Sequence, residues 1–303
     1  MVLPRRASHY PAQAVVTGEM AMKTWVNRIG SYPQLSIGLA IMAVIILFGG
    51  IGPLFVNVSG ANVGSAPVDQ PPSLTYPLGT DTVGRQLLAV LVVGTPLTLS
   101  IGLIAGAIGL GVGTVLGFTA GYYGGGLDFL FRGAADVFLT VPGLLILVVI
   151  ATSTKGAVDV ATEALVVSAL AWMWPTRTIR SQVLTMRERG YVQVAKFSGA
   201  SGWKIILKEM MPNLLPYLAT SFVSAVAAAI LASIGLEALG LGPQNQPTLG
   251  MTIYWALYYT AVLRGLVWWW LPPIIIIILI FVGLYLIAAG LDQIANPRLR
   301  STA

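Results

Sequence analysis

The sequence predicts an all-α polytopic membrane protein, and this prediction rests on its composition and on the length of its apolar runs. Of its 303 residues, 56% are hydrophobic and only 9% are charged, and the mean hydropathy is +0.82. A soluble domain carries about 25% charged residues. A helix needs roughly 20 apolar residues to cross the hydrocarbon core, where lipid offers the backbone no hydrogen-bond partner. Several runs in this chain reach that length.

Six segments are predicted to be transmembrane helices: residues 35–56, 88–117, 136–152, 162–175, 217–239 and 271–289. The second is longer than one crossing needs, so part of it is expected to tilt or lie flat, and the fourth is short. The second segment also contains Gly102-x-x-x-Gly106 and Gly109-x-x-x-Gly113. Glycines at this spacing share one helix face, so neighbouring helices are expected to approach it closely.

The distribution of Lys and Arg predicts the orientation, because these residues are retained on the cytoplasmic side. Six crossings place both termini on one side, together with 14 of the 17 basic residues: Arg5, Arg6, Lys23, Arg28, Arg132, Arg177, Arg180, Arg187, Arg189, Lys196, Lys204, Lys208, Arg298 and Arg300. We therefore predict a multi-pass protein of the cell membrane with cytoplasmic tails at 1–34 and 291–303. A membrane domain at 35–290 includes a cytoplasmic loop at 177–216. The net charge of +6 is read as a topology signal, and no nucleic-acid partner is expected.

The residues needed for several kinds of catalytic or metal site are missing from the sequence. There is no cysteine, which excludes disulfides and thiolate metal sites, and no Gly-Lys-Ser/Thr phosphate loop, so the chain is not expected to hydrolyse ATP itself. The single histidine, His9, lies in the N-terminal tail, so no Ser/His/Asp set forms. The acidic residues near membrane depth all lie near predicted span ends and are expected to be solvated: Asp136, Glu163, Glu237 and Asp292. This pattern disfavours both a membrane enzyme and an ATP-independent carrier or channel, which would need charges near the midplane.

The most informative stretch is residues 190–213, a basic segment between two apolar runs. Residues 191–197 are expected to form one short helix, and residues 198–202 a break in which Ser201 offers an N-cap. Residues 203–211 are expected to form a second helix that ends at Pro212-Asn213. The apolar side chains on this polar frame fit two interpretations. One is a helix held on the membrane surface by lipid head groups, and the other is a lever that inserts into a groove of a soluble partner.

This loop resembles the Glu-Ala-Ala loop of ABC-importer permeases. Gln193-Val194-Ala195 stands at the triplet, Gly199 at the following glycine and Pro212-Asn213 at the end of the pattern. The string 199–203 is similar to the Gly-Ala-Ser-Asp-Trp of the dipeptide, oligopeptide and nickel branch. The resemblance implies that the ATPase-docking residues are Gln193, Val194, Ala195, Gly199, Ala200, Ser201, Trp203, Pro212 and Asn213. Two departures stand out, because Gln193 replaces the usual glutamate and Val194 the usual alanine.

Four further stretches, in the order typical of the same branch, extend the resemblance over residues 35–300: Leu-Gly-Thr-Asp at 78–81 with Gly-Arg at 84–85, Gly-Tyr-Tyr-Gly-Gly at 121–125 with Asp128, Leu-Gly-Leu-Gly at 239–242 with Gly250, and Asp292 with Asn-Pro-Arg-Leu-Arg at 296–300. The order fits the second permease of the pair, which has the shorter first outer loop. Gln-Asn-Gln-Pro at 244–247 and Leu249 depart from the family pattern near the expected substrate entrance, so the substrate class stays open among dipeptides, oligopeptides, oligosaccharides and nickel.

The resemblance implies the fold of a type I ABC importer permease with six transmembrane helices. It also implies a set of partners, namely a homologous second permease, two ABC ATPase subunits, an extracytoplasmic substrate-binding protein and the surrounding membrane lipid. No cofactor is expected in this chain, since ATP and Mg²⁺ would bind to the partner ATPases. The expected function is to form half of the translocation path for peptides or oligosaccharides.

Overall fold

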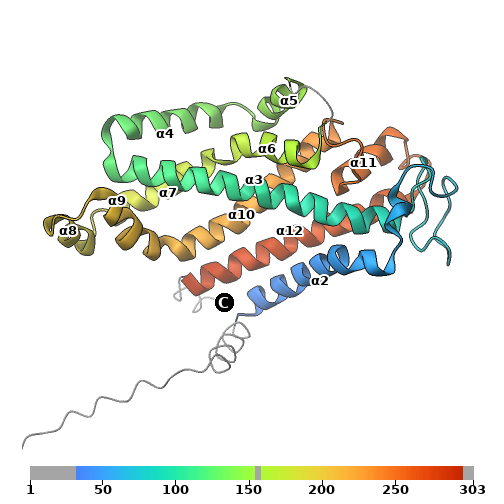
Figure 1. The fold of residues 1–303 in the computed structure, drawn as a ribbon, viewed down its shortest axis with the longest axis horizontal. Helices are drawn as coiled ribbons and strands as arrows, with labels where there is room; N and C mark the ends of the chain where they lie inside the picture. The colour runs from blue at the N-terminus through green and yellow to red at the C-terminus, as the bar shows by residue number, and fades with distance from the viewer. Residues whose placement is uncertain (1–31, 154–157, 296–303) are drawn as a thin grey trace, which may run out of the picture.

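The computed structural model describes residues 32–153 and 158–295, and in this part of the chain the protein is an elongated bundle of helices (Figure 1). The predicted tails at 1–34 and 291–303 fall mostly outside these residues. In the described ranges the regular secondary structure is helical, apart from an isolated β-bridge between Thr80 and Gln86. The elements are α2 (Pro33–Phe55), η1 (Val58–Ala61), α3 (Leu87–Tyr123), α4 (Gly125–Thr140), α5 (Gly143–Ser153), α6 (Val160–Ala171), α7 (Met173–Met186), α8 (Gly190–Phe197), α9 (Gly202–Ile205), η2 (Ile206–Met210), α10 (Met211–Ala238), α11 (Leu249–Tyr258) and α12 (Val267–Ala295).

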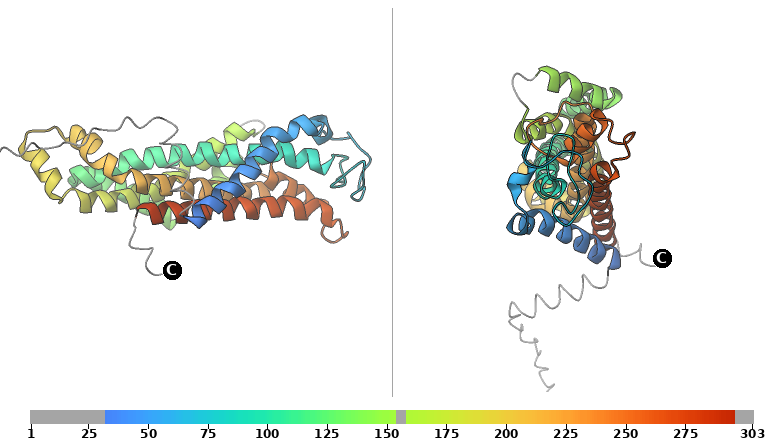
Figure 2. Two further views of the ribbon diagram at one scale, coloured as in Figure 1. Left: turned by 90° about the horizontal axis from the view of Figure 1, so that it is seen from below. Right: turned by 90° about the vertical axis from the view of Figure 1, so that its right-hand side faces the viewer.

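The long helix α3 is the axis of the bundle, and α2, α6, α7 and α10 pack around it (Figure 2). Its 37 residues correspond to about 55 Å of helix, more than one bilayer crossing needs. The predicted glycine face is where its neighbours approach. A methyl group added at Gly106 would lie 2.9 Å from the Val226 nitrogen of α10, and one at Gly113 would lie 2.9 Å from the Trp172 oxygen. The predicted close approach is therefore confirmed, and it joins α3 to α10 and to the α6–α7 segment.

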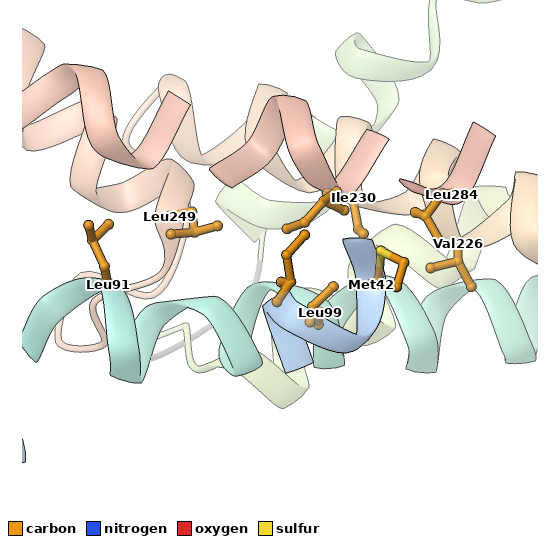
Figure 3. Packing of buried hydrophobic residues seen from close by; sticks show 9 residues of the cluster. Met42, Leu91, Leu99, Val226, Ile230, Leu249 and Leu284 are labelled. Atoms are coloured by element: carbon orange, nitrogen blue, oxygen red, sulfur yellow. The ribbon is translucent and has the colours of Figure 1, made fainter. Parts of the chain in front are cut away.

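The central core lies where α2, α3, α10, α11 and α12 meet (Figure 3). Met42 of α2, Leu99 of α3 and Ile230 of α10 belong to one buried cluster, which Leu249 and Leu284 extend into α11 and α12. Many large apolar side chains on the outer faces of α2 and α12 are exposed, as expected for surfaces that face lipid. Among the described residues, four helices are long and apolar enough to cross a membrane, and a fifth crossing results if α4 and α5 count together.

The predicted single span at 136–152 is wrong in its shape. The chain bends by 91° between α4 and α5, and Val141 is extended at φ −87° and ψ 134°. Pro142 follows it, and a proline disfavours the helical conformation of the residue before it. The predicted fourth span corresponds to α6, with 12 residues, and the start of α7. The count of six crossings stays a prediction, because α6 alone is too short to cross.

The predicted helix end at Pro212-Asn213 is also wrong. Helix continues from Gly202 to Ala238, passing through one π turn at Ile206–Met210 before Pro212 in the first turn of α10. A proline has no N–H to donate, so an uninterrupted α-helix would lose a hydrogen bond at this position. The wider π turn just before it accommodates the change in hydrogen-bond register. The expected second docking helix is therefore the first part of a membrane-length helix.

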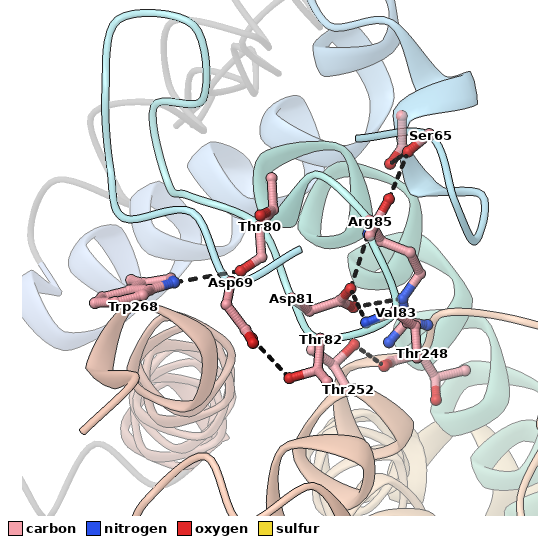
Figure 4. A network of polar contacts seen from close by, with 12 residues as sticks. Ser65, Asp69, Thr80, Asp81, Thr82, Val83, Arg85, Thr248, Thr252 and Trp268 are labelled. Atoms are coloured by element: carbon pink, nitrogen blue, oxygen red, sulfur yellow. Dashed lines mark hydrogen bonds and ion pairs between the residues drawn. The ribbon is translucent and has the colours of Figure 1, made fainter. Parts of the chain in front are cut away.

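The segment between α2 and α3 folds into an irregular but well-bonded cap at the far end of the bundle from α8 (Figure 4). The Asp81 carboxylate is fully buried and accepts hydrogen bonds from the Val83 and Arg85 backbone N–H groups at 3.0 and 2.8 Å. It also pairs with the Arg85 side chain at 2.6 Å. Arg264 reaches across from the α11–α12 connection to pair with Asp69. This end of the molecule satisfies most of its polar groups internally.

Candidate functional site

The candidate site is the surface of α8 and α9, which projects from one end of the bundle (Figure 1). Helix α8 ends at Phe197, and Gly199, two residues further on, has a φ of +77°. The Gly199 N–H bonds to the Lys196 carbonyl at 3.0 Å and the Ala200 N–H to the Ala195 carbonyl at 3.2 Å. These two bonds form a Schellman ending, in which glycine supplies the left-handed residue. The predicted break after the first short helix is confirmed, and Gly199 is the residue that makes it.

One face of α8 is buried against the bundle. Val192 is fully buried in a cluster with Ile205, Ile206 and residues of α3 and α7 such as Phe118 and Ile179. Ala195 and Ala200 are partly buried against the same cluster. These two alanines, predicted to dock an ATPase, therefore face largely toward the protein's own core and help to seat α8.

The opposite face exposes large apolar side chains. The exposed fractions are 65% for Val194, 89% for Phe197 and 51% for Trp203, and Gly199 and Ser201 are exposed beside them. Phe197 is absent from the predicted site residues although it is the most exposed of these. Its place in the last turn of α8, beside the predicted glycine, was the signal in the sequence. This surface is called the α8–α9 face below, and it consists of Val194, Phe197, Gly199, Ser201 and Trp203.

Gln193 points inward. Its side-chain amide donates a hydrogen bond to the Arg187 carbonyl at 3.0 Å, and the Arg187 side chain in turn donates to the Gly121 carbonyl at the end of α3 at 3.1 Å. Gln193 thereby ties α8 to the end of α7 and, through Arg187, to α3. A glutamate carboxylate has no proton to donate at neutral pH, so the glutamine makes a bond that the usual residue at this position would not make.

The end of α3 also supports the loop through its two tyrosines. Tyr123 contacts Trp203 edge-on, with ring centroids 6.2 Å apart, and the Lys196 ammonium lies 5.4 Å from the centre of the Tyr122 ring. Gly202 allows this approach, because a methyl group there would lie 2.7 Å from the Tyr123 hydroxyl. The α8–α9 segment is thus fastened to the helix that forms the axis of the bundle.

An ion pair fixes the neighbouring helices at the same end. Arg180 of α7 pairs with Asp128 of α4, with 2.6 Å between Arg180 Nη2 and Asp128 Oδ2, and both side chains are mostly buried. The hydrogen bonds that Arg180 donates to the Asp128 carboxylate raise the pKa of Arg180 above its usual value, so the guanidinium stays charged. This pair therefore joins α4 to α7 at the same end of the bundle as α8.

The remaining predicted site residues contribute less to the α8–α9 face. Ser201 occupies the N-cap position of α9, but its side chain makes no capping hydrogen bond. Pro212 and Asn213 are exposed in the first turn of α10. The Asn213 amide donates to the Glu209 carbonyl at 2.6 Å, one turn back in the same helix.

Two of the four acidic residues near membrane depth contradict the expectation of solvated groups. Asp292 is exposed as expected and Asp136 is half-buried, whereas Glu163 and Glu237 are fully buried. The reason is tertiary, since α6 places Glu163 against α10 and the residues after α10 fold back over Glu237. The expectation failed because nearness to a span end sets depth in the bilayer and does not set contact with water.

A cavity of about 650 Å³ opens between α5, α6, α7 and α10. Leu147, Trp174 and Thr178 line parts of the cavity on the other helices. The wall on α10 consists of small residues: Ser221, Ser224, Ala225, Ala228, Ala229 and Ala232. A volume of this size suits a small ligand. The sequence offered no prediction for this region, because small residues in an apolar helix read equally as helix packing.

Comparison with known proteins matches residues 113–301 to the family described as binding-protein-dependent transport system inner membrane component. The oligopeptide transport system permease protein OppC of Mycobacterium tuberculosis is 32% identical over 77% of this chain and 79% of its own length. The dipeptide transport system permease protein DppC of Alkalihalophilus pseudofirmus is 29% identical over 88% of this chain and 86% of its own length. The glutathione transport system permease protein GsiD of Pectobacterium atrosepticum is 29% identical over 58% of each chain.

Proposed function

The chain belongs to the family of binding-protein-dependent transport system inner membrane components, and we propose that the α8–α9 face is where it receives the motion of a partner ATPase. It is a multi-pass inner-membrane permease subunit of an ABC importer of the dipeptide and oligopeptide type, and its family is one of permeases, not enzymes. In this proposal ATP and Mg²⁺ bind to the partner ATPase subunits, where ATP is hydrolysed. In the proposed orientation, which follows the distribution of Lys and Arg, α8 and both termini lie on the cytoplasmic side.

One observation supports the docking surface above all. The α8–α9 face exposes Val194, Phe197 and Trp203 together on a segment whose buried face and backbone are firmly held by the bundle. A short helix with apolar anchors on a rigid base fits a groove in a soluble partner. A helix held by lipid head groups would gain nothing from ties to α3 and α7, so the bonds of Gln193 and Arg187 favour the protein partner.

The contacts suggest a path for the motion. A displacement of α8 acts on α3 through Arg187 and Tyr123, and on α10 directly, because α9, the π turn and α10 form one continuous helix. The α10 helix lines the cavity described above. We propose that this cavity is this chain's part of the translocation path, with peptides as the substrate class on the strength of the relatives' names. A second permease, two ATPases and an external binding protein complete the assembly.

The docking proposal is tested with Gly199→Asp. Nothing lies within 4 Å of the position that a side chain at Gly199 would take, and Asp is one of the residues that tolerate a positive φ comparatively well, so the variant is expected to reach the membrane. It is expected to uncouple uptake from ATP hydrolysis, because a carboxylate would stand at the tip of the docking face. Gly64→Asp, at an equally open position with φ +75° in the outer segment between α2 and α3, is the control, because it carries the same backbone strain away from the docking face. Wild-type coupled uptake by Gly199→Asp would overturn the proposal, and copurification of subunits with phosphate-loop motifs tests the assembly separately.

The path is tested by labelling, for which the absence of native cysteine is convenient. A thiol introduced by Ser224→Cys is expected to react with a water-soluble maleimide, and substrate and ATP are expected to change the rate. Leu231→Cys is the control on the same helix, since Leu231 is 62% exposed on the outer surface of α10 and lies outside the cavity lining. Equal, substrate-independent rates at both positions would contradict the proposed path.

A further inference from the structure

Two fully buried carboxyl groups meet where α6 packs against the outer end of α10. Glu163 lies in the first turn of α6, and Glu237 lies in the last turn of α10. Their carboxyl groups are within hydrogen-bonding reach of each other. The Ser233 hydroxyl, one turn before Glu237, donates to Glu163 Oε1 at 2.9 Å. Residues 70 apart in the sequence are thus joined at one polar point inside an apolar bundle.

Most carboxylate oxygens at this point lack a completed hydrogen bond. Both carboxylate oxygens of Glu237 and one of Glu163 accept no hydrogen bond of normal geometry within the described residues. The N–H groups of Gly250 and Met251, at the start of α11, and the Thr248 hydroxyl point toward Glu237 without completing such a bond. Thr248 already accepts from the Met251 N–H as the cap of α11. Two carboxylates are both pure acceptors, so they cannot bond to each other unless one carries a proton.

Within residues 32–153 and 158–295, the elements packed around the two carboxylates offer no cation to compensate them. The elements packed against α6 and α10 include α3, α5 and α11, which carry no Asp, Glu, Lys, Arg or His. The titratable groups of α11 are Tyr254 and Tyr258. The charged residues on the other packed elements are Arg177 and Arg180 of α7, Lys208 and Glu209 of η2 and Asp292 of α12. Of these, both arginines pair with carboxylates of α4, and the η2 residues lie at the opposite end of the continuous α9–α10 helix.

We propose that Glu163 and Glu237 form a proton-binding site, in which a shared proton joins α6 to the outer end of α10. Two adjacent negative charges in a buried, apolar setting would be strongly unfavourable, and a bound proton removes one charge and supplies the missing donor. The site also sets the position of the segment after α10. Gly250 passes directly over Glu237, and a side chain at Gly250 would collide with that carboxyl group. Loss of the proton would push α6 away from α10 and loosen the start of α11.

The site goes beyond ATPase docking and does not depend on it. Its test is infrared absorption by the assembled importer, purified with its partner subunits in lipid nanodiscs. At pH 7 ordinary glutamates, with a pKa of about 4.3, are ionised. The difference between the wild type and the double variant Glu163→Gln, Glu237→Gln is expected to contain a C=O band of a protonated carboxylic acid. Asp159→Asn is the control, because Asp159 is an exposed carboxylate at the N-cap of α6, and this change is expected to leave the band in place.

Single variants cover the case in which the double variant fails to assemble. An amide at either position supplies the donor that the proton supplies, so Glu163→Gln and Glu237→Gln are each expected to lose the band. A wild-type difference spectrum with only carboxylate bands would overturn the proposal. Exchanging sodium chloride for choline chloride provides the second arm. A band that is absent in sodium and present in choline would show that a sodium ion, and not a proton, neutralises the pair, and would also overturn the proposal.

Discussion

The two ends of the bundle solve opposite problems. At the outer end, residues 57–86 fold over the helices, and Asp81 and Arg85 form a buried ion pair (Figure 4). At the α8 end, the polar contacts of Gln193 and Arg187 face inward, and Phe197 and Val194 are left exposed. The buried charges of the outer segment pair within it, whereas the polar contacts of the α8 end hold α8 in place and leave large apolar side chains exposed on its other face. The proposed docking of a partner at the α8 end rests on this contrast, and the following variants test it.

The largest effect on stability is expected at the outer end, from Asp81→Ala. The change removes the acceptor of three hydrogen bonds and leaves the Arg85 guanidinium buried without its partner. Breaking a buried pair in this way costs about 3–5 kcal/mol. Thermal unfolding of the purified importer, and protease cleavage within residues 57–86, measure the loss. Arg264→Ala is the matched control, because its pair with Asp69 is partly exposed and is expected to contribute about 1 kcal/mol or less. Equal losses in the two variants would contradict the contrast in burial.

Phe197→Ala is expected to separate docking from stability. The side chain is almost fully exposed, so the free energy of unfolding should change by less than about 0.5 kcal/mol. As an apolar anchor it is expected to contribute about 2 kcal/mol to ATPase binding, which corresponds to roughly a 30-fold loss of affinity. Copurified ATPase and coupled uptake are the measurements. Leu263→Ala, which removes a similarly exposed side chain at the outer end, should leave ATPase binding unchanged, and a similar loss in both would refute the assignment of the two ends.

A smaller loss is expected from Asp128→Asn, which weakens the pair that joins α4 to α7. Hydrogen bonds to charged groups contribute about 1.5 kcal/mol or somewhat more, and the Asp128 and Arg180 side chains are mostly buried. Asp136→Asn provides the comparison on the same helix. Asp136 is 3.7 Å from Arg177 and 3.9 Å from Arg132, and its side chain is 45% exposed, so its removal should cost less than about 1 kcal/mol. Thermal unfolding of the two variants side by side would show whether burial sets the order.

The smallest effect is expected from Gln193→Glu. The carboxylate cannot donate to the Arg187 carbonyl, so one hydrogen bond of about 1 kcal/mol is lost and α8 is held less firmly. Coupled uptake should fall by several fold at most, with ATPase binding retained. Gln193→Met, which has a similar length and no amide, should behave alike if the tether is what matters. Tighter ATPase binding by Gln193→Glu would instead assign this position to direct docking.

The sequence predictions that depended only on residues close together in the chain were confirmed at Gly199 and along the glycine face of α3. Gly199 ends α8 because only a residue tolerant of positive φ fits there, and the glycine face of α3 admits α10 and α7 as its spacing predicts. Pro212 was misleading because proline is common both just after a helix ends and in the first turn of a helix. The π turn before it lets the helix continue past the proline. The bend at Pro142 was missed because the apolar pattern continues through it.

The sequence by itself determined that the chain is a helical membrane protein with a protruding basic loop, since composition and hydropathy act through solvent and need no knowledge of the fold. It also located the short helix and the glycine of the α8–α9 face. Only the tertiary structure decided which face of α8 is exposed, that Gln193 bonds inward, and that Glu163 and Glu237 are buried together. These features depend on contacts between residues far apart in the chain. Periodicity within one helix shows which residues share a face, and packing alone shows what that face meets.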